Sequence, residues 1–464
     1  MLTGNQYRES LRDGRASFIE GEPVEDPANH PLLKVAVDAC AAGYDKFYRT
    51  DPGAYSPMYI IPRNNEEMDE RERLLAGAHE MTASTSGTSI LALSSAAPDL
   101  AKARPEYRQR IYDFIDYVRQ EDLRCAETVT DAKGNRRLRP GQQDDKDMYV
   151  HVVDRNGDGV FITGCKMHIS AAAIEHELVL FPTKAMRPGE EEYAIACSVP
   201  ANAQGVTLIN TTYAPHGKDV RHFPVSSHIN SPEGYIVFDR VFVPNNRVFL
   251  DGEVEYASTL AYSLGLWERS AGGGYGDRVD RIVGLAALAA EMAGVANETH
   301  IHEKLSTLMI FATMCRAGWD SAMAKATTNE DGNMMPSTLY VSATKYYHAE
   351  LHDKMIDILH DIAGTLVVNA PTMADYDNPD LRPGLDALFS TPGFSTEDRL
   401  KLYHFIRDTT ADSYGGWSSV TGKQAGGGQY AQRLVTLRNF DLERAKDLAR
   451  RTVGIGVEAE VPFI

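Results

Sequence analysis

The chain is short of cysteines and of basic residues for its length of 464 residues. Its five cysteines include no Cys-x-x-Cys pair, so we expect neither a disulfide framework nor a compact zinc site. Its 47 Lys and Arg stand against 65 Asp and Glu, which leaves a formal net charge of −18. Such an acidic balance disfavours a nucleic-acid binder, because neutralising phosphates needs a concentrated basic face.

Long apolar runs are also absent from the sequence. No stretch approaches the roughly 18 apolar residues that a membrane span requires. Residues 1–15 lack the apolar centre of a signal peptide. The composition, 43% apolar and 24% charged, is that of an ordinary globular protein. We therefore expect a cytoplasmic protein that binds neither membrane nor nucleic acid.

Hydrophobic spacing divides the chain into three parts. The first part has helical spacing, most clearly over residues 104–123, where several apolar side chains share one face. These side chains are Ile111, Phe114, Ile115 and Val118. Short β-branched runs between residues 148 and 243 predict a β-barrel or sandwich. From residue 279 onward, long helical segments with few breakers predict an antiparallel bundle.

Short patterns that imitate metal or phosphate sites lack essential parts. Residues 154–159 open like a calcium-binding EF-hand loop, but Cys165 takes the position of the required glutamate. Residues 421–423 resemble the end of a P-loop without its first glycine. His348 and His352 lie one helical turn apart, but no HExxH pattern accompanies them. We therefore expect no metal site.

Five segments in the middle of the chain carry a more specific signal. They are TDAKGNR (130–136), DMYVHVV (147–153), GVFITGCKMHI (159–169), EEYAIACSVP (191–200) and VFDRVFVPNNR (237–247). In this order they resemble the 4-hydroxyphenylacetate 3-hydroxylase family, which contains reduced-flavin monooxygenases and the flavin and iron–sulfur enzyme 4-hydroxybutyryl-CoA dehydratase. The opening LTGNQYRESLRDGR, DIAG (361–364) and DNPDLRP (377–383) extend the resemblance over nearly the whole chain.

The resemblance implies an α+β, acyl-CoA-dehydrogenase-like fold that usually assembles as a homotetramer. It divides this chain into an N-terminal helical domain (1–125), a middle β-barrel or sandwich domain that faces the flavin (126–262), and a C-terminal helical bundle that also serves oligomerisation (263–464). The order of helical, β and helical parts agrees with the hydrophobic spacing.

The same resemblance implies a site for FAD against the β domain. The candidate cofactor-binding residues are Thr128, Thr130, Arg136, Ser170, Gly426 and Gly427. The Ser170 hydroxyl would face the flavin N5, and the two glycines would allow the adenine–phosphate end of a neighbouring subunit's flavin to approach. Alternatives stay open: strand packing for Thr128 and Thr130, a surface salt bridge for Arg136, a capped strand end for Ser170 and a surface loop for the glycines.

Departures from the family pattern concern the reacting end of the site. Carrying the cluster ligands of the dehydratase onto this chain gives Thr85, Ser89, Glu268 and Tyr275, none of which is a thiolate or imidazole. We therefore expect no iron–sulfur cluster. Thr85 and Ser89 instead become candidates for a hydroxyl-lined substrate pocket, with a helix start rich in capping residues as the alternative.

Two glutamates complete the set of candidates. Glu127 stands where the hydroxylases carry a histidine, so it is a candidate acceptor of a substrate proton; the alternative is a charged loop residue. Glu233 corresponds to a carboxylate of the dehydratase, and we expect it to be a surface residue at a strand edge rather than a catalytic base.

The function that the resemblance implies is that of a monooxygenase using reduced FAD. As the oxygenase component of a two-component system, it would receive reduced FAD from a flavin reductase and hydroxylate an aromatic or heteroaromatic small molecule with O2 through a C4a-hydroperoxyflavin. The absence of an NAD(P)H fingerprint agrees with this. The alternative is a cluster-free FAD-dependent lyase or isomerase acting on an acyl-CoA-like substrate. A third possibility is an inactive scaffold.

Overall fold

The N-terminal part is helical, as the spacing predicts. The computed structural model describes residues 1–75, 80–213, 219–267, 274–424 and 427–456, the side chains of 80–84 and 274–277 excepted. The helices are α1 (Gly4–Ser10), α2 (Lys34–Phe47), α3 (Asn65–Leu75), α4 (Glu80–Ala103) and α5 (Pro105–Glu121). Helix α5 begins at Pro105, a residue whose missing amide hydrogen costs nothing in a first turn. Its predicted apolar face is buried.

The middle part is a sandwich of two sheets rather than a barrel: the strands described here form two separate sheets. One sheet has the order β2-β1-β8-β9-β5-β4 and the other β10-β7-β6-β3. Their bounds are β1 (Ala16–Ile19), β2 (Glu22–Pro23), β3 (Cys125–Thr128), β4 (His151–Arg155), β5 (Gly159–Ser170), β6 (Glu177–Leu180), β7 (Ile195–Pro200), β8 (Val206–Thr211), β9 (Glu233–Pro244) and β10 (Val248–Asp251). Apolar side chains from both sheets share one core.

Two strands cross the expected domain boundary. Strands β1 and β2 lie in the N-terminal part, yet β1 pairs in parallel with β8, with Ser17 opposite Leu208, and β2 extends the same sheet beyond β1. A parallel pair needs no turn between its strands, so no local sequence signal announces it. The boundaries at residues 125 and 262 stay predictions, and β1 joins the first two parts.

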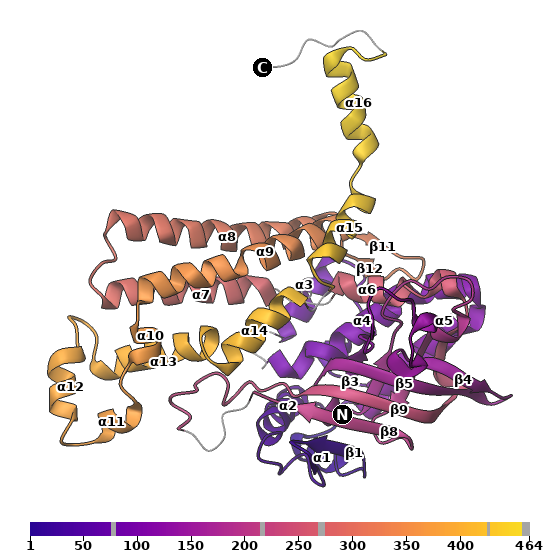
Figure 1. The fold of residues 1–464 in the computed structure, drawn as a ribbon, viewed down its shortest axis with the longest axis horizontal. Coiled ribbons are helices and arrows are strands. Elements are labelled where there is room, and N and C mark those ends of the chain that lie inside the picture. Colours follow the sequence, from indigo (N-terminus) through magenta and orange to yellow (C-terminus); the bar gives the residue numbers. More distant parts are fainter. Residues whose placement is uncertain (76–79, 214–218, 268–273, 425–426, 457–464) are drawn as a thin grey trace.

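The C-terminal part is the predicted helical bundle. Helix α6 (Thr259–Trp267) packs against α4 and leads into three long helices, α7 (Gly274–Met292), α8 (Thr299–Ala324) and α9 (Thr338–Ala363). Further elements are β11 (Thr327–Thr328), β12 (Met334–Met335), α10 (Leu366–Asn369), α11 (Met373–Asp377), α12 (Arg382–Phe389), α13 (Thr396–Thr410), α14 (Ser413–Gln424), α15 (Gln429–Asn439) and α16 (Leu442–Val453). In Figure 1 the long helices extend to one side of the sandwich, and α16 projects from the body.

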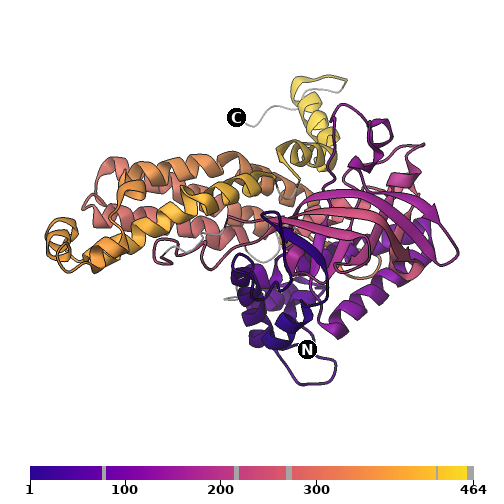
Figure 2. The ribbon, with the colours of Figure 1, turned by 60° about the horizontal axis from the view of Figure 1, so that its bottom comes forward.

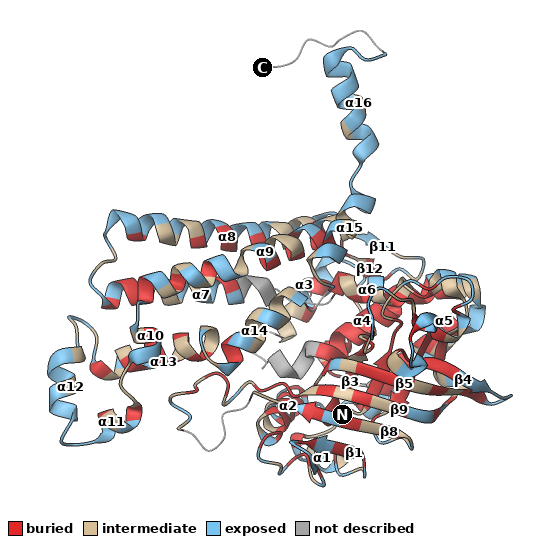
Figure 3. Ribbon diagram, viewed as in Figure 1, coloured by how far each residue is buried: buried red, intermediate tan, exposed pale blue. Residues whose placement is uncertain are grey.

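The turned view shows the sandwich and the bundle meeting along one side, with α14 and α15 on the bundle side (Figure 2). Burial is densest in the sheets and in α4, whereas α16 has no buried residue and is mostly exposed (Figure 3). Among the described helices, we find none with the length and apolar character needed to traverse a lipid bilayer.

Candidate functional site

A large cavity opens where the sandwich meets the helices. Its volume is about 1840 Å³, larger than the roughly 300–1,000 Å³ typical of sites for drug-sized ligands. The walls come from residues 129–136, from the ends of β5 and β9, and from α6, α9, α14 and α15. A cavity of this size can hold a dinucleotide together with a small molecule.

The loop after β3 forms one wall, and the structure brings two of its three candidates to the cavity. Thr130 and Arg136 line the cavity. Thr128 does not: its side chain is fully buried, and its hydroxyl donates to the carbonyl oxygen of Ala126 at 3.2 Å. Because alternate strand residues face opposite sides, the last residue of β3 points into the protein. Thr128 therefore packs inside the sheet, which is the alternative to cofactor binding considered for it.

Positive charge is concentrated at this wall. Lys133 and Arg136 of the loop line the cavity, and so does Lys184, which follows β6. Burial lowers the pKa of Lys133, and the nearby Arg136 guanidinium lowers it further. Gly134 has a φ of +49°, and a Cβ there would meet the Gln143 side chain, so this turn needs glycine. A bound anion such as a diphosphate would reduce the repulsion between these positively charged side chains.

Ser170 and Glu233 face each other at the ends of two neighbouring strands. Ser170 closes β5 and pairs with Glu233, the first residue of β9. The Ser170 hydroxyl lies 3.0 and 3.1 Å from the two Glu233 carboxylate oxygens, and Trp417 Nε1 of α14 donates to one of them at 3.0 Å. We expected Glu233 at the surface; its carboxylate instead lines the cavity beside Ser170.

A second set of polar groups comes from α4 and β3. Thr85 and Glu127 both line the cavity, and the Thr88 hydroxyl donates to Glu127. Ser89 does not reach the cavity, and within the described residues its fully buried hydroxyl has no hydrogen-bond partner. Glycine 426 lies outside the described residues, whereas Gly427 lines the cavity with a φ of +77° before α15.

The positions that correspond to the cluster ligands do not suit an iron–sulfur cluster. Thr85 and Ser89 lie one turn apart on α4 and offer hydroxyls, whereas such clusters are held by thiolates, or by histidines at some irons. Glu268 lies outside the described residues, and the Tyr275 side chain is not described.

Beneath Thr85 lies a buried ion pair that the sequence analysis missed. The Arg124 guanidinium contacts Glu175 Oε1 at 2.8 and 3.1 Å, and both side chains are almost fully buried. Thr85 and Ser86 donate to the same carboxylate at 3.4 Å. Burial raises the pKa of Glu175, and Arg124 opposes that rise. No periodicity or motif marks such a pair in the sequence.

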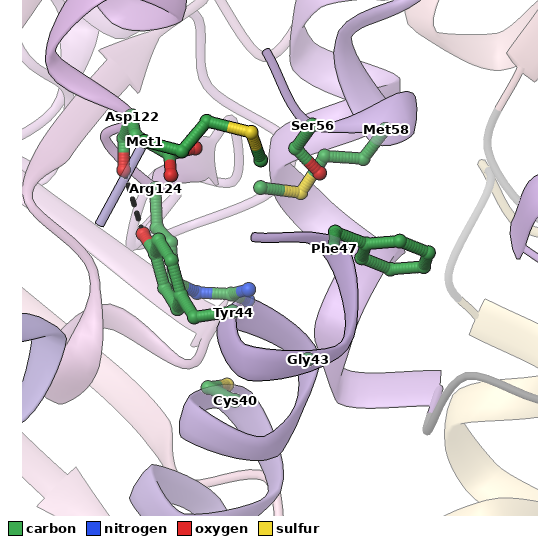
Figure 4. A pocket seen from close by; sticks show the side chains of 9 residues that line it. All are labelled: Met1, Cys40, Gly43, Tyr44, Phe47, Ser56, Met58, Asp122 and Arg124. Atoms are coloured by element: carbon green, nitrogen blue, oxygen red, sulfur yellow. Dashed lines mark hydrogen bonds between the residues drawn. The ribbon is translucent and has the colours of Figure 1, made fainter. Parts of the chain in front are cut away.

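A much smaller cavity on the far side of Arg124 is a packing gap. It measures about 10 Å³ and is lined by Cys40, Tyr44 and Asp122 among others (Figure 4), which is room for about one water molecule. The Tyr44 hydroxyl donates to the Asp122 carbonyl oxygen at 2.7 Å. Burial raises the pKa of the Cys40 thiol to about 11, so this cysteine is not a nucleophile.

The residues around the large cavity fit FAD. A flavin needs a slot with a few directed polar groups, and its diphosphate needs cations. Thr130 and Ser170 supply hydroxyls, and Lys133, Arg136 and Lys184 supply positive charge, all at one cavity.

Two family models match nearly the whole chain. The model for the 4-hydroxyphenylacetate 3-hydroxylase N terminal matches residues 3–250, and the model for the C terminal matches residues 257–454. The 4-hydroxybutyryl-CoA dehydratase/vinylacetyl-CoA-Δ-isomerase of Clostridium aminobutyricum is 24% identical over 98% of this chain and 100% of its own. The oxygenase component of the 4-hydroxyphenylacetate 3-monooxygenase of Thermus thermophilus is 24% identical over 89% of each chain.

A solved structure confirms the predicted fold class. The oxygenase component of 4-hydroxyphenylacetate 3-monooxygenase, complexed with FAD, superposes with a TM-score of 0.86 at 22% identity, over 97% of this chain and 98% of that one. At this identity the likeness establishes the acyl-CoA-dehydrogenase-like fold. The two family models, which cover most of the sequence, show that the chain belongs to the 4-hydroxyphenylacetate 3-hydroxylase family.

Proposed function

We propose that the chain is the oxygenase component of a two-component flavin-dependent monooxygenase that hydroxylates an aromatic or heteroaromatic small molecule. The observation that carries the proposal is the large cavity, where a cationic loop, the Ser170–Glu233 pair and the hydroxyl of Thr85 meet. Named relatives support the same kind of enzyme: one is the oxygenase component of a monooxygenase, and another is an FADH2-dependent monooxygenase.

The loop wall would hold the cofactor. Lys133 and Arg136 are the candidates for binding its phosphates, and the hydroxyls of Thr130 and Ser170 are the candidates for hydrogen bonds to the ring. When bound, reduced FAD supplies the activation of O2. The surrounding residues orient the substrate and exclude water, and the exclusion of water prevents side reactions.

The overall reaction consumes one reduced FAD and one O2 for each hydroxylation. One oxygen atom enters a C–H bond of the substrate, and the other leaves as water with the two hydrogens of reduced FAD. A separate flavin reductase supplies the reduced FAD. At the reacting end, Glu127 is the candidate acceptor of a substrate proton, and Thr85 is a candidate hydroxyl contact.

Isotopically labelled O2 tests the oxygenation directly. Reduced FAD, generated by a generic flavin reductase, is supplied with a panel of phenols and heteroaromatic compounds, and the products are analysed by mass spectrometry. We expect one labelled oxygen atom per product molecule. Ser170→Thr keeps the hydroxyl and serves as the control for Ser170→Ala, which should lower product formed per reduced FAD consumed. An unlabelled product would overturn the proposal.

A redox-neutral lyase or isomerase is the second candidate. The Glu233 carboxylate beside Ser170 favours it, because a base next to the flavin face is suited to proton abstraction. The match to the dehydratase relative covers 98% of this chain as well. Tight retention of oxidised FAD and an O2-independent change in an acyl-CoA compound would favour this candidate.

The absence of a cluster and the tetramer are further parts of the proposal. Hydroxyl side chains at 85 and 89 support a cluster-free protein, and iron analysis of protein purified without oxygen tests this. Exposed apolar side chains of α15, α16 and the link between them, including Leu437, Phe440 and Leu448, support assembly with further copies of this chain.

A further inference from the structure

Lys166 is a buried cation whose ammonium group joins three segments behind the cavity wall. Its side chain is 2% exposed. The Nζ donates to the carbonyl oxygens of Val129 and Phe181 at 2.7 and 2.8 Å and lies 2.9 Å from Asp131 Oδ1. An ammonium group has three hydrogens, so these three acceptors account for all of its donors.

Asp131 extends the same network into the loop. Its Oδ1 also accepts the amide hydrogen of Val150 at 3.0 Å. Its own amide donates to the Thr183 hydroxyl at 2.9 Å, and that hydroxyl donates to the Val129 carbonyl oxygen at 2.7 Å. Asp131 and Lys166 are each 2% exposed, so the ion pair itself lies away from solvent, while Thr183 is partly buried and lines the cavity.

The network fixes which side chains face the cavity. Lys166 and Asp131 form a backbone bridge, and the amide of Met167 donates to the Thr130 carbonyl oxygen at 2.7 Å. Neither member of the pair lines the cavity, but their chain neighbours Thr130, Ala132 and Met167 do. The pair therefore lies directly behind the wall that carries the candidate flavin contacts.

We propose that Lys166 and Asp131 are positioning residues that hold residues 129–134 in the shape that receives the flavin before it binds. This inference rests on the proposed function for its ligand. A buried ion pair adds little net stability compared with neutral side chains of similar size. Its directed bonds instead fix one geometry for the loop, and a loop held in its bound shape costs less to order on binding.

The test removes both charges together. The double variant Lys166→Met/Asp131→Asn replaces each charged side chain by a neutral one of similar size and keeps an oxygen for the Val150 amide, so it leaves no isolated buried charge. The matched control is Arg247→Met/Glu177→Gln, which neutralises another ion pair of the sandwich, 2.6 Å long, away from the loop. We measure unfolding temperature, hydrogen exchange of residues 129–134 without flavin, and anaerobic titration with reduced FAD.

We expect the double variant to stay folded, to exchange the loop amides at least about tenfold faster, and to bind reduced FAD about tenfold more weakly. The control should keep the parent's loop exchange and affinity. Parent-like loop exchange, or parent-like affinity, in the folded double variant would overturn the inference while the proposed function stands. Failure of the parent itself to bind FAD in either oxidation state would overturn both proposals.

Discussion

The cavity has two walls of different character. On the sandwich side, polar groups are buried and bonded to one another: Lys166 to Asp131, and Arg124 to Glu175 behind Thr85. On the helical side, α15 buries only Gln432 among its described side chains, and α16, which follows α15 and does not line the cavity, buries none. Their outward apolar side chains include Leu437 at 63% exposure.

This difference separates two tasks. The sandwich wall completes its packing within a single chain, so it can hold a fixed shape for a cofactor. The helical wall leaves apolar surface uncovered, which fits the proposed assembly with other copies. Changes on the sandwich side should therefore cost folding stability, and changes on the outer helical surface should cost assembly.

The largest effect is expected from breaking the buried pair of the sandwich side. Glu175→Gln removes the carboxylate that neutralises Arg124 in a site closed to solvent, which should lower the free energy of unfolding by about 3–5 kcal/mol. Urea denaturation measures this loss. The control is Asp154→Asn, which removes an exposed partner of Arg240 and should cost less than about 1 kcal/mol. Equal losses for both variants would contradict the contrast between buried and exposed pairs.

The next largest effect is expected on folding stability at acidic pH. Burial lowers the pKa of His176 from 6.5 to about 3, helped by the nearby Arg15 and Arg124. Between these two pH values the unfolded chain therefore binds more protons than the folded chain does. The free energy of unfolding falls as the pH drops through this window. The loss between about pH 7.5 and about pH 5 should be about 2 kcal/mol from this residue.

Denaturation of His176→Gln at both pH values tests this expectation. The variant removes the titrating ring, so it should lose less stability on acidification than the parent does. The exposed His302 on α8 provides the control, since His302→Gln should keep the parent's pH dependence. An unchanged pH dependence in His176→Gln would contradict the assignment.

Structural features that depend on contiguous segments could be predicted from the sequence. Features that depend on pairing between distant segments could not. Hydrophobic spacing was sufficient for the order of helical, β and helical parts, and the family segments located Thr130, Arg136 and Ser170 at the cavity. Thr128 shows the limit: strand side chains alternate between faces, so placing one requires the register. The Glu233–Trp417 bond joins residues 184 positions apart, and no local pattern marks it.

That bond also links the two walls, and removing it should have a modest effect. Trp417→Phe keeps an aromatic ring but loses the Nε1 donor to Glu233. The loss of this hydrogen bond should weaken the contact between the two walls by about 1 kcal/mol. We expect a severalfold drop in product formed per reduced FAD consumed. Trp319→Phe changes a tryptophan that does not line the cavity and packs against the cluster around Trp267, and it should keep the parent's yield of product per reduced FAD. If the Trp417→Phe enzyme forms as much product per reduced FAD as the parent does, the two walls act independently.

The smallest effect on folding is expected on the outer helical surface. Leu437 of α15 is 63% exposed and Leu448 of α16 is 50% exposed, so the double variant Leu437→Glu/Leu448→Glu should change the free energy of unfolding by no more than about 0.5 kcal/mol per site. Assembly should change instead, because charges would enter the proposed interface between copies. Size-exclusion chromatography with light scattering should show species smaller than the tetramer that we propose for the parent. Leu388→Glu alters a side chain of α12 that is 87% exposed and should leave the assembly intact. A tetrameric double variant would show that these helices do not hold the copies together, and the helical wall would then be as self-contained as the sandwich wall.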